Sequence, residues 1–343
     1  MTHAAVPAVI IQAPMAGVQD AGLAIAAAQA GAVGSLPAAM LGPDALAREL
    51  ARLASAAGGP CNVNFFCHQP PLPDPARDAA WRQALRQFYA ELGLAPAPAA
   101  TAAAASRQPF SETMAEVLET HPPAVVSFHF GLPAPALLAR VKRLGVAVWS
   151  SATTLPEALW LQAHGADAVI AQGLQAGGHR GHFLDTDPAQ QGPTLALLQQ
   201  WVPLLRLPVI AAGGIATADD VRAARGLGAA AVQAGTAYLL CPEAQTSAVH
   251  RAALQDPAAR SALTNLFSGG LARGLVNRLM RDMGPVSTLA PAFPGATAAL
   301  APLRACAEAQ GRADFSPLWA GDGFAAARAL PAADVTRALA AGW

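Results

Sequence analysis

Short runs of β-branched and other apolar residues alternate along the chain with alanine-rich helical stretches. This alternation predicts parallel strands joined by crossover helices, the pattern of an α/β fold. We expect eight strands, at Val9–Ala13, Ala32–Leu36, Cys61–Phe65, Ala124–Phe128, Val146–Ser150, Ala168–Gln172, Pro208–Ala212 and Ala230–Ala234. Eight such units close into a parallel TIM barrel, which is the fold that we predict.

An open, doubly wound sheet is the structural alternative. That fold normally places a glycine-rich fingerprint directly after its first strand. Here the first predicted strand is followed by Pro14-Met-Ala-Gly17 instead. The sequence therefore favours the barrel.

Two regions interrupt the regular alternation. Residues 70–111 form an insertion after the third strand, with a helix around Trp81–Leu92 and a Pro/Ala-rich surface linker over Ala95–Ala105. Residues 243–301 are expected to form a small, mainly helical, substrate-binding cap. The barrel then comprises residues 1–242 and 302–343, and the final helices, Arg304–Gln310 and Phe324–Ala340, are expected to return to its wall.

The composition of the chain indicates which kinds of ligand the protein can bind. The apolar share of 53% is enough for a large core, and 22 basic residues balance 22 acidic ones, so no net field attracts nucleic acid or an anionic membrane. The four cysteines lack the paired short spacings of a zinc site, so we expect free thiols and no metal. The first seven residues do not resemble an export signal, and we expect a cytoplasmic protein that binds a small molecule.

Glycine-rich segments follow the seventh and eighth predicted strands. Gly213 and Gly214 would let the backbone approach an anion closely, and the helix that starts near Thr217 would present free N–H groups to it. Gly235 and Thr236 offer the same from the next loop. These loops lie where TIM barrels often bind phosphate, although two tight turns would give the same pattern.

Polar side chains at other strand ends suggest a flat, polar-edged ligand. Asn64 and Gln172 would direct amides into the mouth of the barrel, or would satisfy loop backbone groups instead. His179 follows Gly177 and Gly178, which remove bulk beside it, and a histidine near neutral pKa is suited to taking a proton.

Two further histidines are candidates near that position. His182 lies three residues beyond His179 and could compete for its role. His129, at the end of the fourth strand, would contact the substrate or support a group that does. We assign both to substrate binding.

The motifs together resemble those of class I nitronate monooxygenases, in order and in spacing. The matching segments are Gln12-Ala-Pro-Met15, Asn62-Val-Asn64-Phe, Gly173-Leu-Gln175-Ala-Gly-Gly-His179-Arg-Gly181, Ala211-Ala-Gly-Gly214-Ile, Gln233-Ala-Gly-Thr236, Phe267-Ser-Gly, Ala272-Arg-Gly-Leu-Val-Asn277-Arg and Asp314-Phe-Ser-Pro-Leu-Trp319-Ala-Gly321. The similarity extends over nearly the whole chain.

The resemblance implies FMN in the barrel and oxidation of alkyl nitronates, such as propionate 3-nitronate, with O₂ to a carbonyl compound and nitrite. It implies that His179 is the catalytic histidine, and that the enzyme acts as a monomer or homodimer. Transferred by position, the FMN-binding residues would be Met15, Asn64, Gln172, Gly177, Gly178, Gly214, Gln233, Ala234, Gly235 and Thr236.

Three positions depart from the family pattern. Gln175 stands where the family usually has Glu, which removes a carboxylate expected close to the histidine and could alter the imidazole pKa. Ser268-Gly-Gly270-Leu replaces a more polar stretch, and Phe293-Pro-Gly-Ala-Thr297 lacks the expected amide residues. These differences concern the identity of the substrate more than the binding of FMN.

Two other functions remain open at this stage. Flavin-dependent enoyl-acyl-carrier-protein reductases and NAD(P)H:quinone reductases share the barrel and a Gly-Gly-His loop, but they require a reduced nicotinamide. No basic run is present to dock an acidic carrier protein. A non-catalytic barrel that binds phosphate or flavin is the more distant alternative.

Overall fold

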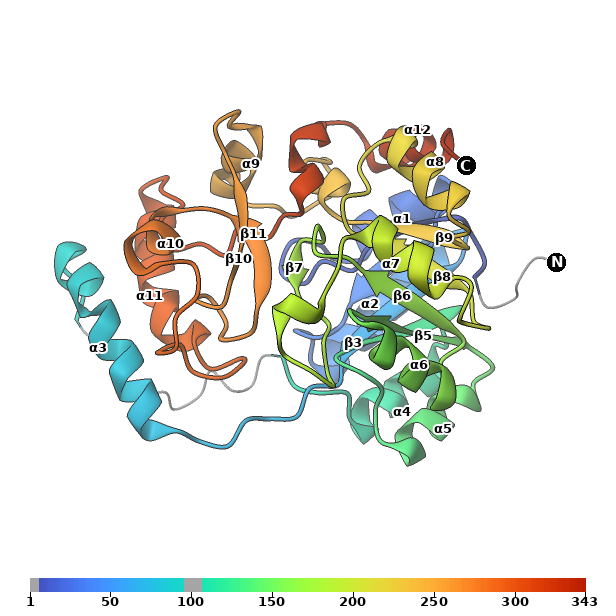
Figure 1. Cartoon of the computed structure of the whole chain (residues 1–343), viewed down its shortest axis with the longest axis horizontal. Coiled ribbons are helices and arrows are strands. Elements are labelled where there is room, and N and C mark those ends of the chain that lie inside the picture. The colour runs from blue at the N-terminus through green and yellow to red at the C-terminus, as the bar shows by residue number, and fades with distance from the viewer. Residues whose placement is uncertain (1–5, 96–106) are drawn as a thin grey trace.

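The computed structural model describes residues 6–95 and 107–343 (Figure 1). The first five residues and nearly all of the predicted linker Ala95–Ala105 lie outside the described residues.

Eight parallel strands form the barrel that the sequence predicts. They are β1 (Ile10–Gln12), β2 (Gly34–Pro37), β3 (Cys61–Phe66), β4 (Val125–His129), β5 (Ala147–Ala152), β6 (Ala168–Gln172), β8 (Val209–Ala212) and β9 (Ala231–Ala234). Their order in the sheet is β1-β9-β8-β6-β5-β4-β3-β2. Each overlaps its predicted segment, so the eight predicted strands are confirmed.

The two edge strands, β1 and β2, nearly close the barrel. A parallel bridge joins Ile11 to Val33. Val33 donates its N–H to the Ile10 carbonyl at 2.9 Å, and Gln12 donates to the Val33 carbonyl at 3.0 Å. Closure in this way leaves few unpaired edge groups.

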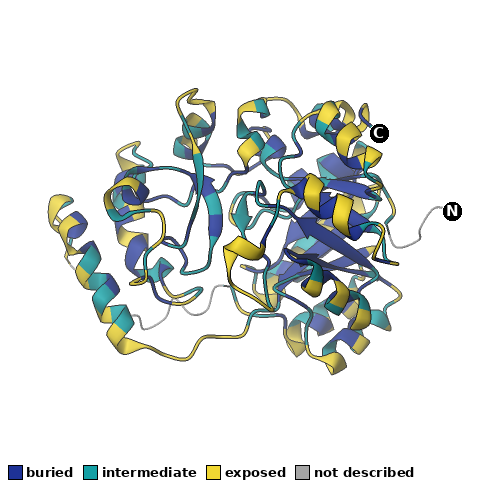
Figure 2. Cartoon of the chain, in the orientation of Figure 1, coloured by how far each residue is buried: buried dark blue, intermediate teal, exposed yellow. Residues whose placement is uncertain are grey.

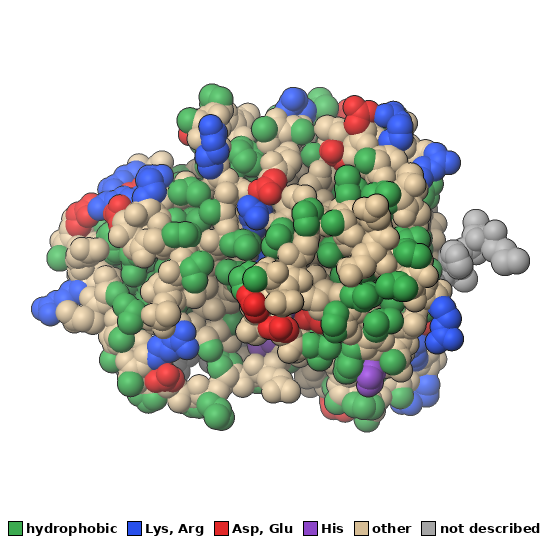
Figure 3. Space-filling view, viewed as in Figure 1, with side chains coloured by type: hydrophobic (Ala, Val, Ile, Leu, Met, Phe, Trp, Pro, Cys, Tyr) green, Lys and Arg blue, Asp and Glu red, His purple; other side chains and the backbone are tan. Residues whose placement is uncertain are grey.

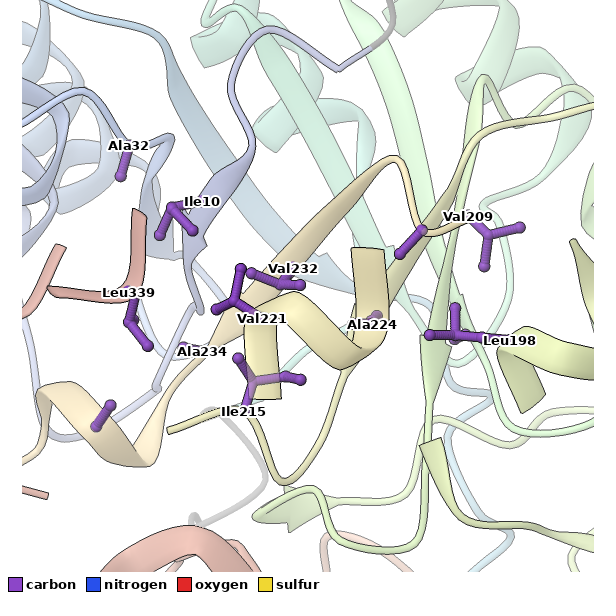
Figure 4. Packing of buried hydrophobic residues seen from close by; sticks show 14 of the residues in the cluster. Ile10, Ala32, Leu198, Val209, Ile215, Val221, Ala224, Val232, Ala234 and Leu339 are labelled. Carbon is purple, nitrogen blue, oxygen red and sulfur yellow. The ribbon is translucent and has the colours of Figure 1, made fainter. Parts of the chain in front are cut away.

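Alternate side chains of each strand face opposite sides, and both sides are buried. Ile11, Trp149 and Ile210 belong to the cluster that fills the barrel interior. Their neighbours, such as Val209 and Val232, face outward against the helices (Figure 4). Strands buried on both faces explain the continuous apolar runs in the sequence.

Helices surround the strands, with buried inner and exposed outer faces (Figure 2). They are α1 (Ala21–Gln29), α2 (Pro43–Ala56), α4 (Glu112–Thr120), α5 (Pro135–Lys142), α6 (Leu155–Ala163), α7 (Thr194–Trp201), α8 (Ala218–Gly226) and α12 (Ala332–Ala340). Short 3-10 turns cover Pro188–Gln190, Thr236–Tyr238 and Asp322–Ala326.

A second body of structure packs beside the mouth of the barrel (Figure 1). It contains α3 (Pro75–Glu91), α9 (Ala248–Gln255), β10 (Ser261–Thr264), β11 (Ala272–Leu275), α10 (Arg278–Met283) and α11 (Thr297–Ala309). Trp81 and Tyr89 of α3 pack in one cluster with Leu300 and Leu303 of α11. The helix of the insertion therefore covers the cap.

Two features of the cap differ from the sequence expectations. Helix α11 crosses the predicted boundary at residue 302 and packs against α3, whereas α12 does return to the barrel, beside α1 and α8. The segment 243–301 also contains the antiparallel strands β10 and β11. Apolar positions in such short strands do not distinguish strand from helix by periodicity.

The surface agrees with the balanced composition. On the face shown in Figure 3, acidic and basic side chains are intermixed and neither sign forms a continuous patch. Within the described residues, no helix combines the length and apolarity needed to cross a membrane. The four cysteines form no disulfide.

The outer packing layer predicts a large effect at Trp201. This side chain at the end of α7 is completely buried in the cluster between helices and strands. Trp201→Ala should lower the free energy of unfolding by about 3–5 kcal/mol, because it leaves a large cavity. Leu204→Ala, at a side chain 55% exposed, is the matched control and should change it by less than about 0.5 kcal/mol. Denaturant unfolding of both variants measures the difference, and equal stabilities would contradict the assigned packing.

Candidate active site

One cavity lies at the carboxyl ends of the barrel strands and brings together most of the predicted site residues. Eleven of them line it: Met15, Asn64, His129, Gln172, Gly177, Gly178, His179, Gly214, Gln233, Gly235 and Thr236. Segments far apart in the sequence thus meet at the position where TIM barrels carry their sites.

Two predicted residues do not line this cavity. The Ala234 side chain packs in the layer between strands and helices, and its carbonyl accepts a hydrogen bond from Ala13 at 2.8 Å. Gln191 donates to Nδ1 of His182 at 3.4 Å, and burial lowers the pKa of His182. Neither side chain is placed to contact a ligand in the cavity.

The amide of Gln172 holds the loop that carries His179. Its Nε2 donates to the His179 carbonyl at 2.8 Å, and its Oε1 accepts from the Gly181 N–H at 2.7 Å. The sequence allowed the Gln172 amide either to bind a ligand or to hydrogen-bond loop backbone groups, and these contacts support the second interpretation. A role of Gln172 in binding FMN stays a prediction.

The Arg180 side chain also stabilises this loop through hydrogen bonds. Its buried guanidinium donates to the carbonyls of Gln172 and Gly173 at 2.7 and 2.8 Å, and to the Gln191 side chain at 2.8 Å. Its own N–H donates to the Leu271 carbonyl at 2.8 Å. Sequence reasoning did not select Arg180 as a structural residue of the site. An arginine in a motif can bind a ligand or backbone carbonyls, and the sequence does not distinguish the two.

His129 is a neutral positioning group. Its Nε2 lies 3.1 Å from the His179 carbonyl, so Nε2 must carry the proton that is donated. Its Nδ1 then accepts from the Ser151 hydroxyl at 3.0 Å. Burial lowers the pKa of His129 to about 4, which is consistent with this neutral tautomer.

His179 lies among aromatic rings. The ring centroids of Phe66, Phe130, Phe293 and Trp319 are 5.0–6.5 Å from its own. Burial lowers the pKa of His179 well below the ordinary histidine range, and the positive charge of Arg107 lowers it further. The imidazole is therefore neutral at neutral pH and can accept a proton.

Ser268 of the cap orients this imidazole. Its Oγ lies 2.8 Å from His179 Nε2 and 3.4 Å from both the carbonyl and the N–H of Gly270. When His179 donates to Ser268 and Ser268 donates to the Gly270 carbonyl, the Nδ1 lone pair stays free. The same distances allow Ser268 to donate to Nε2 while it accepts from the Gly270 N–H, so Nδ1 can act as a base in the tautomer that carries its proton on Nε2.

The glycine loops lie against the same cavity, as predicted. Gly213 and Gly214 have φ values of +116° and +72°, a backbone that L side chains rarely adopt. The adjoining helix start differs from the expectation. The Asp220 carboxylate accepts from Ala216 and Thr217 in a capping box, so these N–H groups are already used.

Gln233 supplies an unpartnered polar atom at the cavity. Its Oε1 is buried and, within the part of the chain that the structure describes, has no hydrogen-bond partner. A buried acceptor without a donor is costly, so a bound ligand with an N–H group would satisfy it. Asn64, within β3, donates to the Ser127 hydroxyl at 3.0 Å.

Gln175 is directed toward a helix start. Its Oε1 accepts from the backbone N–H of Thr194 at 3.0 Å and from the Thr194 hydroxyl at 3.2 Å. Thr194 begins α7, where an acceptor is favoured by the free N–H groups. The amide oxygen of Gln175 therefore serves as a hydrogen-bond acceptor at a helix N-terminus, where it accepts from Thr194.

The site also contains residues that sequence reasoning did not select. Ser268 and Trp319 lay inside motifs of the family resemblance, so a signal for them existed. Phe66 directly follows a quoted motif. Arg107 lies in no motif, and nothing in the sequence indicates that it reaches the cavity.

The fold and the cavity define a TIM-barrel protein with glycine loops and a half-buried histidine at the carboxyl ends of its strands. The sequence profile of the nitronate monooxygenase family matches residues 1–342, and the chain belongs to this family of flavin-dependent oxidoreductases. It is therefore an enzyme.

Individual relatives agree with this assignment. A nitronate monooxygenase of Pseudomonas aeruginosa is 44% identical over 96% of this chain and 94% of its own length. One from Paraburkholderia phytofirmans is 38% identical over 96% of this chain and 90% of its own length. The solved structure of a nitroalkane oxidase from Streptomyces ansochromogenes is 38% identical, covers 98% of this chain and 96% of its own, and has a TM-score of 0.89.

The position of the His179 loop depends on a close backbone contact at Gly177. A Cβ at this residue would lie 2.5 Å from the Gly321 nitrogen and 2.6 Å from the Ala320 carbonyl carbon. Gly177→Ala should therefore displace the loop, lower the free energy of unfolding by about 1–3 kcal/mol and speed hydrogen exchange at His179.

Gly226→Ala is the matched control for this variant. Gly226 ends α8, and a Cβ there meets nothing within 4 Å. Thermal unfolding and hydrogen-exchange mass spectrometry should show no loss in this control. If Gly177→Ala behaved like the control, the contact would not constrain the loop.

Proposed function

We propose that the protein binds FMN and oxidises alkyl nitronates, such as propionate 3-nitronate, with O₂. The carbon–nitrogen bond is broken, the carbon takes an oxygen atom as a carbonyl, and the nitrogen leaves as nitrite. The observation that carries this proposal is the neutral, half-buried His179 beside glycine loops in one cavity of a chain from this family.

The residues present fit FMN. The Gly213–Gly214 loop and the Gly235–Thr236 loop would hold its phosphate through backbone N–H groups. The orphaned Oε1 of Gln233 suits the ring edge of an isoalloxazine, which carries an N–H donor. Met15, close to Gly235, would contact the ring. When bound, FMN supplies the electron transfer to and from the substrate.

The protein's own contribution is to position the substrate and to handle its proton. With a neutral nitroalkane, Nδ1 of His179 takes the α-proton, while Ser268 fixes the orientation of the ring. With a preformed nitronate, no proton has to be removed, and His179 only orients the anion. The aromatic rings around the imidazole keep water away from the reacting carbon.

The first test is the reaction itself. The purified protein should show flavin absorbance and release FMN on denaturation. With propionate 3-nitronate it should consume O₂ and produce nitrite. Rapid bleaching of the flavin by NADPH would favour a nicotinamide-dependent reductase instead, and a colourless protein that takes up no FMN would overturn the proposal.

Replacement of the histidine separates its two roles. His179→Asn should lower kcat/KM for neutral nitroalkanes about a hundredfold or more, because the general base is lost. Activity on preformed nitronates should fall by less than about tenfold. His164→Asn, at an exposed histidine after α6, is the control and should leave both rates unchanged. An equal loss on both substrates in the His179 variant would contradict proton abstraction.

A further inference from the structure

Of the Asp, Glu, Lys and Arg side chains in residues 6–95 and 107–343, only Arg107 lines the cavity. The lining includes this arginine and three histidines, whose pKa values are lowered by burial, but no Asp or Glu. Among the described residues, the guanidinium makes one hydrogen bond, in which Nη1 donates to the Thr297 hydroxyl at 2.9 Å. An arginine has five N–H donors, so most of them remain available to a ligand.

No carboxylate compensates this charge in the described part of the chain. Other arginines have one: Arg140 contacts Glu112 and Glu119, and Arg278 contacts Glu91. Burial lowers the pKa of Arg107, and the charge of Arg304 lowers it further. A cation held in a partly buried site without a counter-ion is unfavourable until an anion binds.

The backbone at Arg107 is also unusual. Its φ is +69°, and Phe130 is the other residue besides glycine with a positive φ among the described residues. Arg107 lines the same cavity as His179, and Phe130 has its ring centroid 6.5 Å from the imidazole. Backbone strain of this kind persists where the surrounding structure enforces it, and it is concentrated at ligand sites.

The position of Arg107 differs from that of the glycine loops. It is attached to the cap, because Thr297 begins α11 and donates its own hydroxyl to the Phe267 carbonyl at 3.1 Å. The glycine loops, in contrast, lie at the ends of β8 and β9. A ligand that spans the cavity would therefore meet a cation on the cap side and the histidine at the barrel mouth.

We propose that Arg107 binds a carboxylate of the substrate, at the end of the molecule away from the reacting carbon. The proposal rests on the proposed function and assigns Arg107 as the residue that selects a nitronate with a second anionic group over one without it. The planar guanidinium matches a carboxylate with paired hydrogen bonds. Arg107 thus determines specificity and takes no part in the proton transfer.

The test compares two nitronates of equal carbon number. Propionate 3-nitronate carries a carboxylate, whereas propyl-1-nitronate ends in a methyl group. The wild-type enzyme should prefer the first by at least about tenfold in kcat/KM, as expected for a charge-assisted contact. Arg107→Gln should remove most of this preference by raising KM for propionate 3-nitronate, with kcat and the rate on propyl-1-nitronate changed less than about threefold. Arg107→Lys should restore part of it.

Arg86→Gln is the matched control. Arg86 is an exposed arginine of α3 in the same cap, so the variant removes the same charge outside the cavity. It should retain the wild-type preference. Equal losses on both substrates in Arg107→Gln would mean that Arg107 binds the nitronate group itself or only supports the fold, and would overturn the proposal.

Binding without turnover separates this proposal from the proposed function. Calorimetric titration of the FMN-loaded protein with succinate, an analogue of propionate 3-nitronate in which an unreactive carboxylate replaces the nitronate group, should give a Kd at least about tenfold weaker for Arg107→Gln than for the wild type. This difference in a protein that fails to oxidise propionate 3-nitronate would contradict the proposed reaction alone. Equal Kd values, or no binding by the wild type, would overturn the role of Arg107.

Discussion

The site depends on the need to satisfy the backbone of one buried loop. Residues 173–181 cross the mouth of the barrel, where their carbonyl and N–H groups are shielded from water, and a buried peptide group without a partner is costly. Gln172, His129 and Arg180 provide these partners. Strand β7 (Gly178–His179) provides others by pairing with β11 of the cap. His179 is therefore fixed by contacts to its own main chain as much as by contacts to its ring.

The electrostatic design of the cavity follows from burial. Burial is the main cause that lowers the pKa values of the histidines that line it, and Arg180, although buried beside the loop, donates to backbone carbonyls. Arg107 is left as the uncompensated charge. Neutral His179 can take a proton from the reacting end of a substrate, and the positive charge of Arg107 attracts an anionic group on it. Together they are complementary to an anionic substrate, whether its reacting carbon still carries the proton or has already lost it.

Alternation of apolar strands and alanine-rich helices was sufficient to predict the barrel, because both faces of its strands are buried and their register follows from closure. The strand ends also indicated most of the cavity. The sequence could not show that the Gln172 amide donates to the His179 carbonyl, because an amide can hydrogen-bond a ligand or a carbonyl equally well. Nor could it show that Ser268 contacts the His179 ring or that Arg107 lines the cavity, because both depend on how the cap packs on the barrel.

The pairing of β7 with β11 has a mechanical consequence. Arg273 and Ala272 of the cap hairpin are in register with Gly178 and His179. The Arg273 side chain also donates to the Ser261 hydroxyl and contacts Asp322 at 2.9 Å, which ties the hairpin to the chain that closes over the loop. A cap that rotated on a hinge as a rigid lid would carry the histidine away from the barrel with it. Passage of substrate and product must therefore use local side-chain movement, so that the base stays in register while the cavity exchanges its contents.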